Sequence, residues 1–259
     1  MIDLTSIAII PARMGSTRFP GKPMAKIHDI PMIGHVYKRA QKIKNVDLIC
    51  VATCDIEIFD YISGINGLAI MTSEKHERAT ERTAEALETI EKEYKQEYDI
   101  VAMIQGDEPM FNPHDIDEAI TSMKEEDEIN IVNLMNKVTN EEDFVDPNNV
   151  KVVIANNYDA LYYSREPIPS NWKKQNKQNM LVQTGLIIFR AYYLKRFLKM
   201  QPTDLEKIES CDMLRVLEHG DSVRMMMSDT RSIGVDSPAD LELAEKLMHN
   251  DAVMKSYKG

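Results

Sequence analysis

Three basic side chains lie close together in a glycine-containing segment near the N-terminus. They are Arg13, Arg18 and Lys22, all within residues 11–23. Guanidinium and ammonium groups, beside glycines that let the backbone approach closely, suit the binding of a triphosphate. The segment is not a Walker A loop, because five residues separate Gly15 from Gly21 where four are required, and Pro23 stands where Ser or Thr would bind magnesium. A solvated basic loop on the surface is the alternative.

Acidic side chains follow two apolar segments farther along the chain. Asp107 and Glu108 come soon after the apolar residues 99–104, and Asp236 follows another apolar step. Mg²⁺ favours one or two carboxylates together with phosphate oxygens. If Asp107 and Asp236 converge in the fold, they make a two-carboxylate magnesium site that faces the basic segment.

Both acidic segments also have a purely structural explanation. Asp107 or Glu108 could merely organise the turn into the next helix. Asp236 or Ser237 stands directly before Pro238, where either side chain would be a good cap for the first turn of a helix. The residues alone leave these alternatives open.

The elements that must position these side chains alternate between strands and helices in the first half of the chain. Residues 6–11 form a continuous β-branched apolar run, which is typical of a strand buried on both faces of a parallel sheet. Further strands are predicted at 47–53, 67–71 and 99–104, and helices at 32–43, 56–63 and 80–98. This alternation predicts a doubly wound α/β sheet with right-handed crossovers. In such sheets ligands bind outside the carboxyl ends of the strands, where the candidate residues lie.

The second half of the chain predicts a different arrangement. A helix at 113–126 is followed by extended segments at 129–138, 150–155, 161–163 and 181–190, and helices at 204–219 and 238–248 close the chain. Strands without long helices between them indicate an extension of the sheet. We therefore expect one α/β domain over residues 1–259, with a mixed, mostly parallel sheet and a smaller sheet extension at 129–200.

Charge and hydropathy exclude several partners. The chain has 31 basic and 42 acidic side chains, a formal net charge of −11. Double-stranded nucleic acid and anionic membranes are bound chiefly through excess Lys and Arg, so neither is expected as a partner. No apolar run approaches the roughly 18 residues that cross a bilayer. The first residues also lack a basic signal-peptide region, so we expect a cytoplasmic protein.

Five segments resemble one enzyme family in both their order and their spacing. They are I-I-P-A-R-x-G-S-T-R-x-P-G-K-P at residues 9–23, Q-G-D-E-P at 105–109, D-P-N-x-V-K-V-V at 146–153, A-L-Y-Y-S-R at 160–165 and G-V-D-S-P-x-D-L at 234–241. These segments are similar to those of 3-deoxy-manno-octulosonate cytidylyltransferases, also called CMP-Kdo synthetases. The resemblance extends over about residues 6–245.

The resemblance implies a nucleotidyltransferase fold, an activity and partners. Enzymes of this family transfer CMP from CTP to a 2-keto-3-deoxy sugar acid and release pyrophosphate, with Mg²⁺ as cofactor. The expected substrate is Kdo or a related or modified acid, for surface polysaccharide or lipopolysaccharide synthesis, and the expected assembly is a homodimer that forms through the 129–200 extension. The alternatives are a cytidylyltransferase for a different sugar acid or a polyol phosphate, and a non-catalytic nucleotide-binding relative.

The resemblance also implies roles for individual residues. Catalysis falls to Arg13, Lys22 and Asp107, and the metal to Asp107 and Asp236. The implied nucleotide-binding residues are Arg13, Ser16, Arg18, Lys22, His76, Thr80 and Arg82. The implied sugar-binding residues are Gln105, Tyr163, Arg165, Gln183, Glu209, Asp212 and Met213.

Three segments depart from the family pattern. Residues 76–82 read H-E-R-A-T-E-R where the family has H-Q-S-G-T-E-R, so that Arg78 and Ala79 replace Ser and Gly. Residues 182–190 lose an arginine, a histidine and two tyrosines, and residues 205–215 carry Asp212 and Met213 in place of Glu and Gln. Each unpaired buried hydroxyl costs roughly 1–3 kcal/mol. A pocket with Met213 and Ile187 should therefore prefer a sugar with fewer or differently placed hydroxyls.

Overall fold

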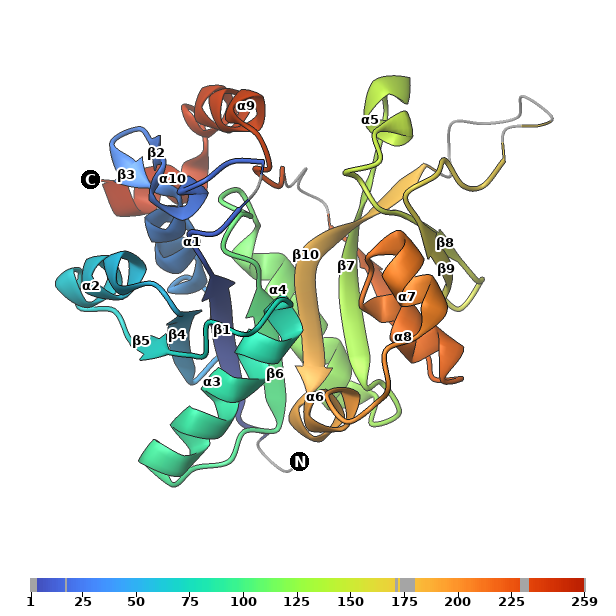
Figure 1. The fold of residues 1–259 in the computed structure, drawn as a ribbon, viewed down its shortest axis with the longest axis horizontal. Helices are drawn as coiled ribbons and strands as arrows, with labels where there is room; N and C mark the ends of the chain where they lie inside the picture. The colour runs from blue at the N-terminus through green and yellow to red at the C-terminus, as the bar shows by residue number, and fades with distance from the viewer. Residues whose placement is uncertain (1–3, 17, 171, 173–179, 229–232, 259) are drawn as a thin grey trace.

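The computed structural model describes residues 4–16, 18–170, 172, 180–228 and 233–258 (Figure 1). Its main feature is a nine-stranded sheet that runs through the whole molecule. From one edge to the other, the strands are β11 (Arg224–Met227), β7 (Ile131–Lys137), β10 (Leu181–Arg190), β6 (Ile100–Ile104), β1 (Ser6–Ala12), β4 (Leu48–Thr53) and β5 (Ala69–Met71), with β8 (Lys151–Ile154) and β9 (Ala160–Ser164) attached at β10.

The sheet is mixed, and most of the pairs along its main path are parallel. Strand β1 pairs in parallel with β4 and β6, β4 with β5, and β11 with β7. Strand β10 is antiparallel to both of its neighbours, β6 and β7. A second, two-stranded antiparallel sheet consists of β2 (Lys26–Ile27) and β3 (Ile30–Pro31). The predicted fold class, a mixed and mostly parallel α/β sheet of nucleotidyltransferase type, is confirmed.

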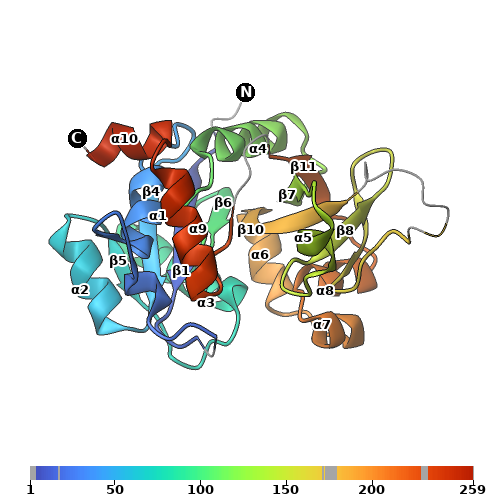
Figure 2. The same cartoon turned by 90° about the horizontal axis from the view of Figure 1, so that it is seen from above.

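Helices cover both faces of the parallel strands. Alternate residues of β1 belong to different cores: Ile7 and Ile9 pack with the helix α3 (Ala79–Tyr94), whereas Ile10 packs with α1 (Met32–Ala40), α2 (Ile56–Gly64) and α4 (Pro113–Glu125). Figure 2 shows α3 and α4 on opposite sides of the central strands. Every residue of β1 is buried, as expected for a continuously apolar strand between two layers of helices.

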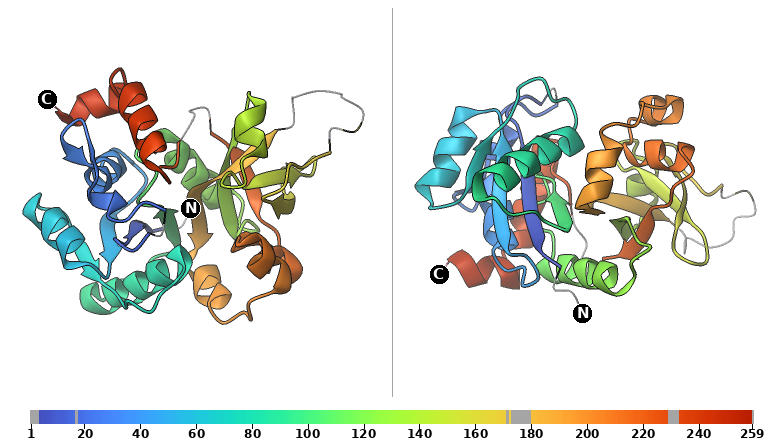
Figure 3. Two further views of the ribbon diagram at one scale, coloured as in Figure 1. Left: turned by 45° about the horizontal axis from the view of Figure 1, so that its top comes forward. Right: turned by 90° about the horizontal axis from the view of Figure 1, so that it is seen from below.

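The end of the chain packs against its beginning. Helix α9 (Pro238–Met248) contacts β2, and α10 (Ala252–Lys258) contacts α1. Figure 3 shows both C-terminal helices beside the β2–β3 hairpin and α1. This docking carries the segment before α9, which contains Asp236, to the same side of the sheet as the loop after β1.

The predicted helix at 204–219 is in fact two helices, and this is the main correction to the expected elements. Helix α7 (Asp204–Glu209) ends at Ser210, whose φ of +48° is left-handed, and α8 (Met213–Glu218) starts three residues later. The apolar periodicity continues through the break, which is why it was missed. Three short helices were also missed: α5 (Glu141–Val145), α6 (Ala191–Phe197) and α10. So was the edge strand β11.

No helix in the described part of the chain is long and apolar enough to span a membrane.

Candidate active site

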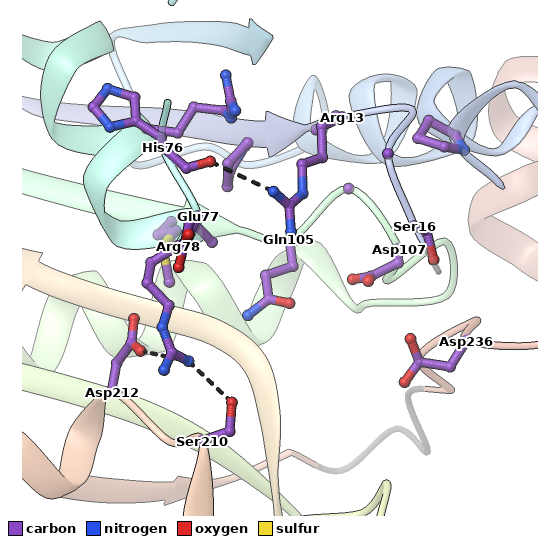
Figure 4. A pocket seen from close by; sticks show the side chains of 18 of the residues that line it. Arg13, Ser16, His76, Glu77, Arg78, Gln105, Asp107, Ser210, Asp212 and Asp236 are labelled. Carbon is purple, nitrogen blue, oxygen red and sulfur yellow. Dashed lines mark hydrogen bonds and ion pairs between the residues drawn. The ribbon is translucent and has the colours of Figure 1, made fainter. Parts of the chain in front are cut away.

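A cavity of about 480 Å³ lies at the carboxyl ends of the parallel strands β1 and β6 (Figure 4). One wall comes from the loop after β1 and the N-terminal end of α3. The opposite wall comes from β10 and from the break between α7 and α8. The loop after β6 lies between them. The cavity is therefore where the strand order predicts a ligand in an open α/β sheet.

Lys22 joins the two carboxylates that the sequence proposed as a pair. Its Nζ lies 2.7 Å from Oδ2 of Asp107 and 3.0 Å from Oδ1 of Asp236, and it also donates to the carbonyl of Val235 at 2.9 Å. Arg18 makes a further ion pair with Asp236 at 3.0 Å. The expected convergence of Asp107 and Asp236 beside the basic segment is thus present, and the segment is not merely a solvated surface loop.

The structural alternatives for the two acidic segments do not account for these carboxylates. Ser237, not Asp236, caps α9, because its hydroxyl accepts from the amide of Asp240. Helix α4 is capped by Asn112, four positions after Glu108. Glu108 does have a structural role, since its Oε1 accepts from the amide of Gly185 on β10 at 2.8 Å. Asp107 and Asp236 are therefore left to face Lys22.

Two glycines let the loop after β6 lie close to its neighbours. A Cβ on Gly106 would come within 3.1 Å of the Pro11 carbonyl oxygen, and the Gly106 amide in fact donates to that oxygen at 3.2 Å. A Cβ on Gly185 would come within 2.9 Å of the Gln105 side chain. Gly185 therefore leaves room for Gln105 to lie across β10 at the floor of the cavity.

The electrostatics of this cluster hold Lys22 in its charged form. Burial lowers the pKa of Lys22, but the charges and hydrogen bonds of Asp107 and Asp236 together raise it above its usual 10.5. The Lys22 side chain is 11% exposed, against 25% for Asp107 and 34% for Asp236. A single cationic group thus contacts two carboxylates that remain accessible from the cavity.

The same pair of carboxylates has the chemistry of a Mg²⁺ site. Both contribute an oxygen to one shared positive charge, the Lys22 ammonium. Mg²⁺ in nucleotide sites takes one or two carboxylates and completes its shell with phosphate oxygens and water. No cluster of three or more His, Cys, Asp or Glu side chains suited to a metal occurs among the described residues. The donors fit a magnesium ion that is shared with a phosphate.

Most of the remaining residues with an implied nucleotide role line the cavity, and one does not. Arg13, Ser16, Arg18, His76 and Arg82 line the cavity. Arg13 donates to the His76 carbonyl at 3.5 Å, and the His76 ring contacts Glu85. Arg82 is 3% exposed and donates to Thr72 and to the Ser73 carbonyl, while its Nη2 has no partner among the described residues.

Thr80 is the one implied nucleotide residue whose side chain the structure turns elsewhere. It is 1% exposed and does not line the cavity. Its hydroxyl donates to Oδ2 of Asp212 at 2.7 Å, so it supports the opposite wall.

Four of the residues with an implied sugar role line the cavity: Gln105, Gln183, Asp212 and Met213. Tyr163, Arg165 and Glu209 do not. Tyr163 is fully buried, and Glu209 accepts from the Ser164 hydroxyl at 2.9 Å and from the Arg165 amide at 2.7 Å. The Arg165 guanidinium donates to the backbone carbonyl of Glu209. The contacts of Arg165 and Glu209 tie the end of β9 to α7, and Tyr163 is enclosed behind the cavity wall.

Arg78 lines the cavity and belongs to the 76–82 segment that the resemblance implies to lie near the nucleotide, but it is not among the implied binding residues. Its Nη1 lies 3.2 Å from Oδ1 of Asp212 and donates to the Ser210 hydroxyl, also at 3.2 Å. The signal that could have found this contact is present in the sequence, because Arg78 and Asp212 both stand where the chain departs from the family pattern. Because Arg78 and Asp212 lie far apart in the sequence, the sequence alone does not indicate that they are in contact.

Comparison with known proteins gives matches over nearly the whole chain. The cytidylyltransferase family matches residues 7–227. The 3-deoxy-manno-octulosonate cytidylyltransferase of Thermodesulfovibrio yellowstonii is 42% identical over 95% of this chain and 99% of its own length. The enzyme of the same name from Geobacter metallireducens is 41% identical over 93% and 96%. A solved CMP:2-keto-3-deoxy-manno-octonic acid synthetase in complex with CTP superposes with a TM-score of 0.85, at 34% identity, and covers 95% of this chain and 98% of that one.

Proposed function

Because this chain belongs to the 3-deoxy-manno-octulosonate cytidylyltransferase family, a family of nucleotidyltransferases, we propose that it transfers CMP from CTP to a 2-keto-3-deoxy sugar acid of the Kdo type. The reaction would release pyrophosphate and depend on Mg²⁺. The observation that carries the proposal is the position of Lys22 between Asp107 and Asp236 at one end of the cavity. This arrangement offers both the positive charge and the metal-binding oxygens that a triphosphate requires.

In the proposed reaction the anomeric hydroxyl of the sugar attacks the α-phosphorus of CTP. A bond forms between that oxygen and the α-phosphorus, and the bond to the bridging oxygen of the β-phosphate breaks, so that pyrophosphate leaves with the electron pair. The hydroxyl proton passes to solvent. Phosphoryl and nucleotidyl transfer of this kind depends mainly on positioning and on neutralising charge. Arg13, Arg18 and Lys22 supply that charge from the loop after β1.

Asp107 and Asp236 would hold the magnesium ion, which when bound neutralises charge on the phosphate oxygens. Lys22 then exchanges part of its contact with the two carboxylates for contact with the phosphates. Its raised pKa keeps the ammonium charged for this purpose at neutral pH. The Gln105 side chain lies between the two ends of the cavity, and we propose that it contacts the sugar there (Figure 4).

The test is release of pyrophosphate from CTP and Mg²⁺ in the presence of a panel of 2-keto-3-deoxy acids. We expect release with at least one acid of the panel and none when the acid or the metal is omitted. No release above background with any member would contradict the proposal. A non-catalytic nucleotide-binding relative would bind CTP without turnover. Mass analysis of the nucleotide product separates a Kdo-type acid from another sugar acid or a polyol phosphate.

The setting of the reaction follows from the same proposal. A cytidylyltransferase for a Kdo-type acid would act in the cytoplasm, where CTP is made, and would supply surface polysaccharide or lipopolysaccharide synthesis. A homodimer that forms through residues 129–200 is part of the proposal, and sedimentation of the purified chain tests it.

A further inference from the structure

The cavity has a second polar end, which the proposed chemistry on phosphate does not use. Arg78 and Asp212 form an ion pair there, with Ser210 beside them. Figure 4 shows this group on the opposite side of Gln105 from Asp107 and Asp236. A substrate that reaches from the phosphate end across Gln105 therefore meets Arg78.

The contacts of this pair engage one end of the Arg78 guanidinium and leave the other for a ligand. Oδ1 of Asp212 is held by Nη1 of Arg78, and Oδ2 accepts from the Thr80 hydroxyl. Among the described residues, the ion pair and the side-chain hydrogen bond of Arg78 are both made by Nη1. The other edge of the guanidinium, with Nε and Nη2, is thus available for a ligand. The Arg78 side chain is 31% exposed, whereas that of Asp212 is 15% exposed.

The chemistry of this edge selects one kind of group. Two parallel N–H donors of a guanidinium match the two oxygens of a carboxylate, which accepts and does not donate. A cytosine edge combines acceptors with an amino donor, so it matches two parallel donors less fully than a carboxylate does. The phosphates have their own cations, Arg18 and Lys22, at the far end.

Arg78 reaches across the cavity to the wall that carries Asp212 and the other lining residues with an implied sugar role, apart from Gln105. Asp212 lies between Cys211 and Met213 in the break between α7 and α8, opposite the loop after β1. Gln183 and Ile187 of β10 line the same wall. A sugar seated there is in reach of Arg78, while the triphosphate is held by the basic loop.

We propose that Arg78 is a specificity-determining residue that binds the carboxylate of the acidic sugar, and that Asp212 is a positioning residue that fixes the orientation of the guanidinium. This inference rests on the proposed function, because it presumes an acidic sugar as the acceptor. In a 2-keto sugar acid the carboxylate is attached to the anomeric carbon. Holding the carboxylate therefore also orients the hydroxyl that attacks the α-phosphorus.

The test compares Kdo with its C1 primary amide, which keeps the planar shape and removes the charge. We expect the wild type to prefer the acid in kcat/KM by at least about tenfold, the equivalent of one charge-assisted hydrogen bond. In Arg78→Gln this preference should fall below about threefold, with the KM for CTP nearly unchanged. In Arg78→Lys, which keeps the charge but loses the fork, part of the preference should return.

Asp212→Asn tests the positioning role separately. It should weaken the acid preference in the wild-type background and have no further effect when combined with Arg78→Gln, because the two residues act through one guanidinium. Additive losses in the double variant would contradict the positioning role. If Asp212 merely stabilised the fold, its replacement would lower kcat/KM for both substrates equally and leave the preference for the acid unchanged.

Arg196→Gln is the matched control. Arg196 also pairs with an aspartate, Asp221, at 2.8 Å, but it is half exposed and outside the cavity. Its replacement should leave the preference at the wild-type value. No product from wild type with Kdo would contradict the proposed function, and this inference with it. Turnover with an unchanged preference in Arg78→Gln would overturn this inference alone, as would a raised KM for CTP without any change in preference.

Discussion

Lys22 and Asp107 are 85 positions apart in the sequence, yet Nζ of the first lies 2.7 Å from Oδ2 of the second. Asp236 completes the contact from the other end of the chain. The group that should neutralise the transferring phosphate is thus paired, before substrate arrives, with the groups that should hold the metal. On the proposed function, a bound metal–triphosphate complex would exchange one set of opposite charges for another, so the Lys22 ammonium would not have to be desolvated anew.

Removal of the Lys22 ammonium should impair the chemical step more than binding. Lys22→Met keeps the length of the side chain, and we expect kcat to fall by about 10²–10³, the usual cost of losing one group that stabilises charge in a transition state. Steady-state kinetics with CTP and the accepted sugar acid measure this. Lys26→Met, an exposed lysine four residues away, is the control and should keep the wild-type rate. A KM effect with an unchanged kcat would assign Lys22 to binding alone.

Neutralising either carboxylate should change the dependence on magnesium. In Asp107→Asn and in Asp236→Asn, we expect the Mg²⁺ concentration for half-maximal activity to rise by at least about tenfold, because each variant loses an anionic ligand. Titration of activity with Mg²⁺ at fixed CTP checks this. Asp204→Asn, a change at a carboxylate that is 92% exposed, should leave the titration unchanged. An equal Mg²⁺ dependence in the wild type and the three variants would show that Asp107 and Asp236 do not bind the metal.

The ion pair between Glu206 and Arg215 should stabilise the wall that carries Asp212. Both side chains are nearly inaccessible, and Nε of Arg215 donates to Glu206 at 2.7 Å. Glu206→Gln leaves the guanidinium buried without its counter-charge, so the free energy of unfolding should fall by about 3 kcal/mol. Urea unfolding measures the loss. Glu93→Gln, at an exposed position of α3, should be nearly neutral.

The same pair predicts a loss of stability in acid. Burial raises the pKa of Glu206, but the hydrogen bonds of Arg215 and Thr203 together bring it below its usual 4.5. A carboxyl with a lowered pKa in the folded state stabilises the fold above its unfolded pKa, and this contribution disappears as the pH falls through the folded value. The difference in stability between wild type and Glu206→Gln should therefore shrink below about pH 4.5. A difference that grows on acidification would contradict this assignment.

His35 predicts a second dependence of stability on pH, at higher pH than that of Glu206. It is fully buried, its ring contacts the Ile27 carbonyl and the Tyr257 hydroxyl, and burial lowers its pKa to about 4. The unfolded chain takes up a proton near pH 6.5, so stability should decline as the pH falls from 6.5 to 4, by up to about 3 kcal/mol. Unfolding at pH 7.0, 5.5 and 4.5 checks this. In His35→Gln the loss of stability on acidification should be smaller than in the wild type. An equal loss in both proteins would show that other groups cause it.

The sequence could predict the parallel half of the sheet because its signals are local. The residues of β1 are continuously apolar, and the loops after β1 and β6 contain the glycines and charges that reach the cavity. Parallel strands carry such loops to one edge of the sheet, so the meeting of Asp107 with the basic segment follows from topology. Asp236 was harder to place, since its position depends on how α9 docks on the first half of the chain.

The wall formed by β10 and the break between α7 and α8 could not be predicted in the same way. The break at Ser210 leaves no mark on the apolar periodicity, and it decides that Asp212 and Met213 line the cavity while Glu209 turns to Ser164. Similarity to a motif likewise does not indicate whether a residue is buried. Tyr163 lies in a matching segment, but its side chain is enclosed behind the cavity wall. Contacts such as Arg78 with Asp212 depend on side-chain directions that appear only in the folded structure.

The most direct test of the central claim is ³¹P NMR of the purified protein with CTP, Mg²⁺ and Kdo. The account predicts that the triphosphate signals are replaced by those of pyrophosphate and of a CMP phosphodiester in equal amounts, and only when all three components are present. Unchanged CTP after prolonged incubation, or formation of CDP and inorganic phosphate instead, would contradict it.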